Sequence, residues 1–232
     1  MAMMHLNHPP PPIGLLLSGG LDSSILLGYL LKQGHSVQPF YIRSGLYWET
    51  AELQALRQLL ATVASPQVRE LVLLDLPLDD LYGDHWSITG KRVPDAASLD
   101  DAVYLPGRNA LLMIKATLWC RLHGVEALAL AVSAANPFPD ATETFFQGFE
   151  AVLDEATSGR VRILCPLTDC SKTQIMQWGR DLPLHLTFSC IAPVDGLHCG
   201  QCNKCAERQA AFRATGRDDP TVYTAPSMSL RA

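Results

Sequence analysis

The strongest constraint on this fold is a glycine turn between two apolar segments near the start of the chain. An apolar β-strand is predicted over residues 13–17 and an apolar helix over 23–33, with Ser18-Gly19-Gly20-Leu21-Asp22-Ser23 between them. Glycines permit a tight turn, and a helix that begins there points its unpaired N–H groups back toward the turn. The sequence therefore predicts a strand–turn–helix unit with a phosphate-sized anion site at the turn.

The rest of the chain continues this alternation. Further strands are predicted over 37–42, 71–74, 127–132 and 162–165, and further helices over 53–63, 109–123, 145–152, 171–180 and 204–215. Strand–helix–strand units join parallel strands through right-handed crossovers. We therefore predict an α/β protein with a doubly wound parallel sheet.

Composition and charge exclude several function classes. The chain has 232 residues, 48% of them hydrophobic, which suits one sizeable domain with a small appendage. Its formal net charge of −5 argues against a broad basic surface, so direct nucleic-acid binding is not expected. Neither a membrane span nor a secretory signal is predicted. We expect a soluble cytoplasmic protein.

Changes in composition divide the chain into three regions. Residues 1–12 end in four prolines and are predicted to be a flexible leader. Residues 13–186 contain the predicted sheet. Residues 187–232 are predicted to form a small metal-binding segment with a short helix and a tail. Within the sheet region, the stretch 79–107 lacks periodicity, and so long a loop is often functional. His85, Trp86 and Lys91 make it a candidate lid.

Four of the seven cysteines have the spacing of a metal site. They follow the pattern C-x8-C-x2-C-x2-C and are Cys190, Cys199, Cys202 and Cys205. Four thiolates can surround one tetrahedral Zn²⁺ with no open position, which is typical of a structural site. Gly200 would help the turn, whereas His198 is too close to Cys199 to be a comfortable ligand. The alternative is a set of buried or redox-active thiols, and Cys120, Cys165 and Cys170 are expected to be ordinary thiols.

The glycine turn resembles the SGGxDS loop of the N-type ATP pyrophosphatases. That resemblance implies cleavage of ATP between its α and β phosphates and adenylylation of a carboxylate or carbonyl oxygen. It implies that ATP with Mg²⁺ is bound by Ser18, Gly19, Gly20, Leu21, Asp22 and Ser23. Asp22 and Ser23 are then catalytic, although either could merely cap the helix. The same loop occurs in several synthetases and tRNA-modifying enzymes, so it leaves the substrate open.

The combination of motifs over 13–215 resembles the QueC family of 7-cyano-7-deazaguanine synthases. Beside the turn and the cysteines, it includes 105–109 (LPGRN), 165–175 and 187–190. The resemblance implies that ATP and ammonia convert 7-carboxy-7-deazaguanine to an amide and then a nitrile, with release of AMP and pyrophosphate. It also implies a structural zinc ion and a small-molecule carboxylate substrate, and it allows a homodimer.

Five further residues are candidates around this chemistry. Arg108 is predicted to contact phosphate or adenylate, and Lys172 to contact ATP phosphates; a solvated side chain is the alternative for each. Asn109, Phe138 and Asp140 are candidate substrate residues. For Asp140 the reason is that a carboxylate can accept from the paired N–H donors of a guanine-like edge. The alternative for Asn109 and Asp140 is a helix cap.

One loop departs from the family pattern. Residues 133–142 lack its acidic pair, and Ala141-Thr142 replace Cys-Arg. An enzyme that adenylylates a deazaguanine or another acid for a different acceptor is therefore a second hypothesis. A tRNA sulfur-transfer enzyme and a non-enzymatic zinc-knuckle module are further alternatives. The intact turn argues against the last of these.

Overall fold

The computed structural model describes residues 11–134 and 136–225. Three parts of the chain lie outside the described residues: most of the predicted leader, position 135 in the loop 133–142, and the last seven residues of the tail. In the described part of the chain, we find no helix with the length and apolar character needed to span a bilayer.

The core of the molecule is one parallel sheet. Its five strands are β1 (Ile13–Leu16), β2 (Val37–Arg43), β3 (Val72–Asp75), β4 (Ala127–Ala129) and β5 (Arg162–Leu164). They lie in the order β3-β2-β1-β4-β5, and every pair is parallel. The central strand β1 pairs on both sides, with Ile13 opposite Val37 and Ala127. This sheet confirms the predicted doubly wound arrangement, because the chain moves outward from β1 in both directions.

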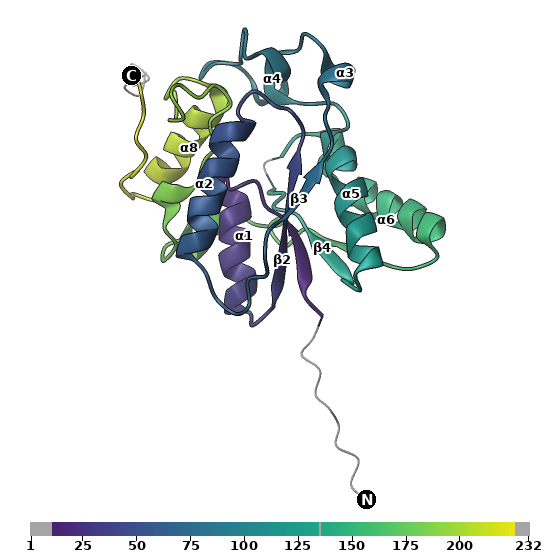
Figure 1. Ribbon diagram of the computed structural model, residues 1–232. Helices are drawn as coiled ribbons and strands as arrows, with labels where there is room; N and C mark the ends of the chain where they lie inside the picture. The colour runs from purple at the N-terminus through teal and green to yellow at the C-terminus, as the bar shows by residue number, and fades with distance from the viewer. Residues whose placement is uncertain (1–10, 135, 226–232) are drawn as a thin grey trace, which may run out of the picture.

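Helices join the strands and cover both faces. They are α1 (Leu21–Lys32), α2 (Glu49–Thr62), α3 (Asp79–Tyr82), α4 (Trp86–Thr89), α5 (Arg108–Leu122), α6 (Glu143–Thr157), α7 (Lys172–Trp178) and α8 (Asn203–Ala214). Three 3₁₀ turns add to them: η1 (Asp100–Val103), η2 (Pro139–Ala141) and η3 (Leu184–Leu186). Figure 1 shows α1, α2 and α8 on one side of the sheet and α5 and α6 on the other.

Each face of the sheet has its own apolar core. One core joins β1 to α1, α7 and α8 through buried residues that include Ile25, Ile175 and Phe212. The other joins the opposite face to α5 and α6, with Met113 and Phe146 among its buried residues. Because the last cysteine, Cys205, lies in the first turn of α8, the C-terminal segment packs onto the same core as the first helix.

Two regions differ from the sequence prediction. The strand predicted over 127–132 ends at Ala129. Its neighbour β5 ends at Leu164, whose carbonyl oxygen accepts the last hydrogen bond between the two segments, from Leu130 N–H. Beyond that bond, β4 has no partner strand on this side within the described chain. The stretch 79–107 contains α3, α4 and η1 rather than one irregular loop. Helices of four residues are too short to produce a visible sequence period.

The start of α5 is fixed by a contact from the loop 133–142. The backbone N–H of Asn109 donates to Asp140 Oδ2 at 3.0 Å, and Asn109 Nδ2 donates to the carbonyl oxygen of Asp140 at 2.9 Å. Asp140 therefore caps the start of α5, whereas Thr142 caps the helix that follows it, α6. Two of the predicted substrate residues are therefore hydrogen-bonded to each other.

Replacing Asp140 by Ala should lower the free energy of unfolding by about 1 kcal/mol, because an unpaired N–H remains at the start of α5. Asp140→Asn keeps an oxygen acceptor and should retain most of that stability. Urea unfolding of the three proteins measures the difference. An unchanged free energy of unfolding in Asp140→Ala would show that the cap contributes nothing, and equal losses in both variants would contradict the role of the oxygen acceptor.

Candidate functional site

The glycine turn has the predicted shape. Gly19 has φ +84°, and a Cβ there would lie 3.1 Å from the Cβ of Leu56, so both conformation and space favour glycine. The Ser18 hydroxyl accepts a hydrogen bond from Gly20 N–H at 3.2 Å and lies 3.2 Å from the Ser23 hydroxyl. Helix α1 begins at Leu21, directly after the second glycine. Its free N–H groups and two hydroxyls thus face one spot, as an anion site requires.

The segment leading to the cysteines braces this turn. The backbone N–H of Phe188 donates to the carbonyl oxygen of Gly19 at 2.8 Å. Its neighbours Ser189 and Ile191 line a cavity of about 280 Å³ in front of the turn, which we call the phosphate cavity. The polar lining of this cavity includes Ser18, Asp22, Arg108, Lys172, Lys204 and Glu207.

A chain of alternating charges crosses the phosphate cavity. Lys172 Nζ lies 2.8 and 2.9 Å from the two oxygens of Asp22 and 3.2 Å from Glu207 Oε1. Glu207 Oε2 accepts from Lys204 Nζ at 2.7 Å. Although burial lowers the pKa of Lys172, the carboxylates of Asp22 and Glu207 raise it above its usual value. Lys172 therefore stays cationic beside the turn, where a capping box formed by Ser171 begins α7.

A second cavity of about 220 Å³ lies at the carboxyl ends of β1, β2 and β4. It shares several lining residues, Ser18 among them, with the phosphate cavity, and its lining mixes polar groups with apolar side chains: Leu16, Phe40, Ile42, Leu112, Leu130 and Val132. Ligands of open α/β sheets bind at this edge, at the point where the strand order reverses. The cavity has the place and character of a nucleoside pocket, so we call it the nucleoside cavity.

A third cavity of about 210 Å³ is bordered by aromatic rings, and we call it the aromatic cavity. Trp48 and Trp86 stack with ring centroids 5.9 Å apart, and Tyr104 and Phe138 lie 4.9 Å apart. Asn109 and Asp140 also line it. Such a pocket suits a planar ring with a few polar groups on its edge. Trp86 thus contributes to a wall, whereas His85 caps α4 by accepting from Ser87 N–H.

Arg108 lines all three cavities. Its Nε atom is buried and has no hydrogen-bond partner among the residues that the structure describes. An orphaned cationic donor at such a junction indicates an anionic ligand. Of the predicted ATP and substrate residues, all but Gly19 line one of these cavities, and Gly19 shapes the turn.

Sequence reasoning missed a buried carboxyl group at the same junction. Glu52 lines the nucleoside and phosphate cavities, and its Oε2 accepts from the Tyr41 hydroxyl at 2.8 Å. Burial raises its pKa to about 7, against lowering by Arg108 and Tyr41. Glu52 precedes the buried Leu56 by one helical turn. The sequence did contain a signal for this burial, because Glu52 lies four residues before Leu56, on the face of the helix that carries the apolar side chains.

The four predicted cysteines converge on one point. Their Sγ atoms lie within 4.8 Å of one another, with 3.8 Å between Cys190 and Cys202 and 3.9 Å between Cys199 and Cys205. A tetrahedral site with Zn–S bonds of about 2.3 Å needs sulfurs about 3.8 Å apart. The cluster is buried, so the residues present fit one such ion.

Backbone amides support thiolates in this cluster. Ala192 and Cys199 donate N–H groups to Cys190 Sγ, and Gln201 and Cys202 donate to Cys199 Sγ, all at 3.3–3.4 Å. Gly200 has φ +80°, as the predicted tight turn requires.

His198 lies outside this ligand set. Its Nε2 accepts from Ser189 N–H at 3.1 Å. Burial and Arg208 lower the pKa of His198 to about 4, so it stays neutral.

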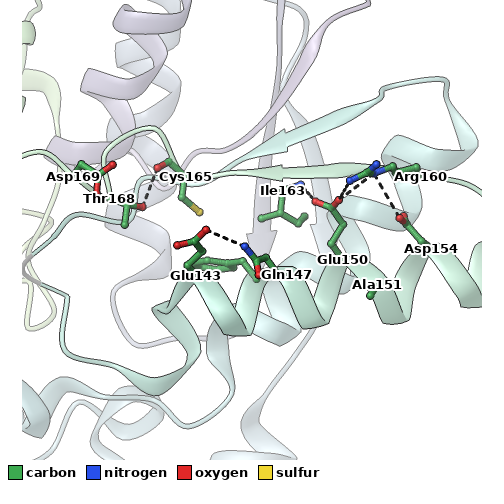
Figure 2. A pocket seen from close by; sticks show the side chains of 11 residues that line it. Glu143, Gln147, Glu150, Ala151, Asp154, Arg160, Ile163, Cys165, Thr168 and Asp169 are labelled. Atoms are coloured by element: carbon green, nitrogen blue, oxygen red, sulfur yellow. Dashed lines mark hydrogen bonds and ion pairs between the residues drawn. The ribbon is translucent and has the colours of Figure 1, made fainter.

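A larger cavity lies elsewhere. It has a volume of about 530 Å³, lies between α6 and the edge strand β5, and shares no lining residue with the three cavities above. Figure 2 shows that Arg160 pairs with Glu150 and Asp154 along its rim. Glu150 accepts from Arg160 at 2.8 Å and from Ile163 N–H at 2.8 Å. Glu150 therefore covers an exposed strand edge, which is a structural role.

Glu52→Gln should make stability less dependent on pH. Because the pKa of Glu52 is raised in the folded protein, its favourable contribution is complete below the unfolded value of 4.5 and is lost as pH rises through about 7. Relative to the wild type, the variant should gain about 2–3 kcal/mol of unfolding free energy between pH 5 and pH 8. Urea unfolding of both proteins at pH 5 and pH 8 measures this change. If the difference in unfolding free energy between variant and wild type is the same at both pH values, the prediction is wrong.

Comparisons with known proteins agree with this site. The family model described as queuosine biosynthesis protein QueC matches residues 14–216. The 7-cyano-7-deazaguanine synthase of Stutzerimonas stutzeri is 33% identical over 222 residues, covering 90% of this chain and 96% of the relative. The protein of that name from Methanothermobacter thermautotrophicus is 29% identical over 221 residues, covering 90% and 97%.

A solved structure shows the same fold. NMN synthetase from Francisella tularensis aligns with a TM-score of 0.50 at 17% identity, over 93% of this chain and 81% of that one. The match to the family model extends from the first strand through α8, the helix that contains the last cysteine. This chain therefore belongs to the QueC family of queuosine biosynthesis proteins.

Proposed function

We propose that this protein is an ATP-dependent carbon–nitrogen ligase that converts 7-carboxy-7-deazaguanine to 7-cyano-7-deazaguanine. The acid is adenylylated, and ammonia displaces AMP to give the amide. A second ATP then adenylylates the amide oxygen, which leaves with AMP as the nitrogen loses its two protons, and the nitrile remains. The observation that carries the proposal is the junction at Arg108, where an anion-binding turn, a nucleoside cavity and an aromatic cavity meet. The names of the relatives support the same activity.

In the first step, the turn and Lys172 would hold the phosphates of ATP. A carboxylate oxygen of the acid forms a bond to the α-phosphorus while the bond to the bridging oxygen of pyrophosphate breaks. The free N–H groups of α1 and the hydroxyls of Ser18 and Ser23 receive the charge that develops on pyrophosphate. Arg108, whose Nε has no partner within the described chain, would bind the α-phosphate.

The aromatic cavity would hold the deazaguanine ring. Trp48, Trp86 and Phe138 supply apolar ring faces, and Asp140 and Asn109 supply polar edges. Asp140 Oδ2 already accepts from Asn109, so Oδ1 is the oxygen proposed for an N–H donor of the base. This arrangement would hold the carboxylate of the acid toward Arg108 and the phosphates.

Two metal ions belong to the proposal. Mg²⁺ bound with ATP would be held by Asp22 and would neutralise phosphate charge. A structural Zn²⁺ would be held by Cys190, Cys199, Cys202 and Cys205, whose geometry fits it. Because Phe188 is bonded to the turn two residues before Cys190, these four ligands would also support one wall of the phosphate cavity.

With ATP, Mg²⁺, ammonia and 7-carboxy-7-deazaguanine, we expect AMP, pyrophosphate and the nitrile. Asp22→Asn and Ser23→Ala should each lower kcat/KM by about 100-fold or more, because each removes a group beside the phosphates. Asp181→Asn, an exposed carboxylate bonded to Lys32, is the matched control. Products are followed by chromatography and folding by circular dichroism. ADP and phosphate as sole nucleotide products, or near-normal activity in both variants, would refute the step.

The same assay without ammonia separates this activity from transfer to another acceptor. An adenylate that never becomes nitrile when ammonia is supplied would favour another acceptor. AMP release with a different acid would overturn the substrate assignment but not the chemistry at the turn.

Metal analysis should find one zinc ion per chain. Cys202→Ser should lose the metal and lower the melting temperature, because four thiolate ligands contribute directly to folding. Cys165→Ser, a thiol outside the cluster, is the control and should keep its zinc. Metal content unchanged in Cys202→Ser would contradict the ligand set.

A further inference from the structure

The border between the phosphate cavity and the aromatic cavity consists of four shared residues. They are Trp48, Arg108, Ile191 and Lys204. Two are apolar, and the other two are cations. Any reaction between a group held in one cavity and a group held in the other takes place beside these two cations.

Lys204 reaches this border from the cysteine segment. It lies in the first turn of α8, between Cys202 and Cys205. Its Nζ donates to Glu207 Oε2 at 2.7 Å, one turn further along the same helix. An ammonium group has three N–H donors, so two remain for a ligand after this contact.

Lys172 differs from Lys204 in its surroundings. Lys172 is bonded to both oxygens of Asp22 and to Glu207, and it lines the phosphate cavity but not the aromatic one. Lys204 lines both. The two lysines, held on opposite oxygens of Glu207, therefore face different parts of the site.

We propose that Lys204 binds the carboxylate of the acid substrate and holds it beside the α-phosphate of ATP. This inference rests on the proposed function, since it requires an acid in the aromatic cavity. A carboxylate and a triphosphate repel each other, and a fixed cation between them offsets that repulsion. The carboxylate remains the nucleophile, its oxygen bonds to the α-phosphorus, and the displaced electron pair leaves on pyrophosphate. Lys204 keeps all its protons.

If Lys204 binds the carboxylate, removal of its charge should weaken binding of the acid and leave binding of the uncharged nitrile nearly unchanged. The dissociation constants of 7-carboxy-7-deazaguanine and of the uncharged 7-cyano-7-deazaguanine are measured by calorimetry without ATP. The proteins are the wild type, Lys204→Met, Lys204→Arg and Lys32→Met. Lys32 is an exposed lysine bonded to Asp181 and serves as the matched control.

Lys204→Met should weaken binding of the acid about tenfold or more and change binding of the nitrile less than about twofold, as expected for loss of one charged hydrogen bond. Lys204→Arg, which keeps the charge, should recover most of the affinity for the acid. In turnover assays, Lys204→Met should raise KM for the acid and leave KM for ATP nearly unchanged.

Two results would overturn the role of Lys204 while leaving the proposed function intact. They are acid binding by Lys204→Met as tight as by the wild type, or equal weakening of the acid and the nitrile. Failure of the wild type itself to bind the acid would instead refute the proposed function and, with it, this assignment.

Discussion

The backbone hydrogen bond from Phe188 N–H to the carbonyl oxygen of Gly19 joins the two parts of the chain on which the site depends. Gly19 belongs to the turn after the central strand, and Phe188 leads into the cysteine cluster. Through this bond the C-terminal segment becomes a wall of the phosphate cavity rather than an appendage. The packing of Phe212 into the core beneath α1 holds that wall in place.

Charge compensation explains why so many ionic groups can lie close together here. Asp22, Lys172, Glu207 and Lys204 alternate in sign across the cavity, so each ion has an opposite neighbour. Arg108 and Glu52 also line this cavity, and burial raises the pKa of Glu52 to about 7. A polyanionic ligand such as ATP would change this balance, and the lysines and Arg108 provide the cations that it needs.

Much of this could be predicted from the sequence because the signals were local. The turn, the five parallel strands and the cysteine cluster each depend on residues close together in the chain, or on one period. The contacts between distant segments could not be predicted. Asn109 and Asp140 are 31 residues apart, and nothing in either segment indicates that they pair. Similarly, Trp48 and Lys204 line one cavity although they are far apart in the sequence, and α2 and α8 lie on the same side of the sheet.

The central claim is that ATP and the acid meet at Arg108, between the glycine turn and the aromatic rings. The most direct measurement is a crystal structure of the protein with α,β-methylene ATP and 7-carboxy-7-deazaguanine. We predict that the triphosphate lies on the turn beside Lys172, and that the deazaguanine ring lies among Trp48, Trp86 and Phe138. Binding of the acid elsewhere, for example in the larger cavity between α6 and β5, would contradict the account.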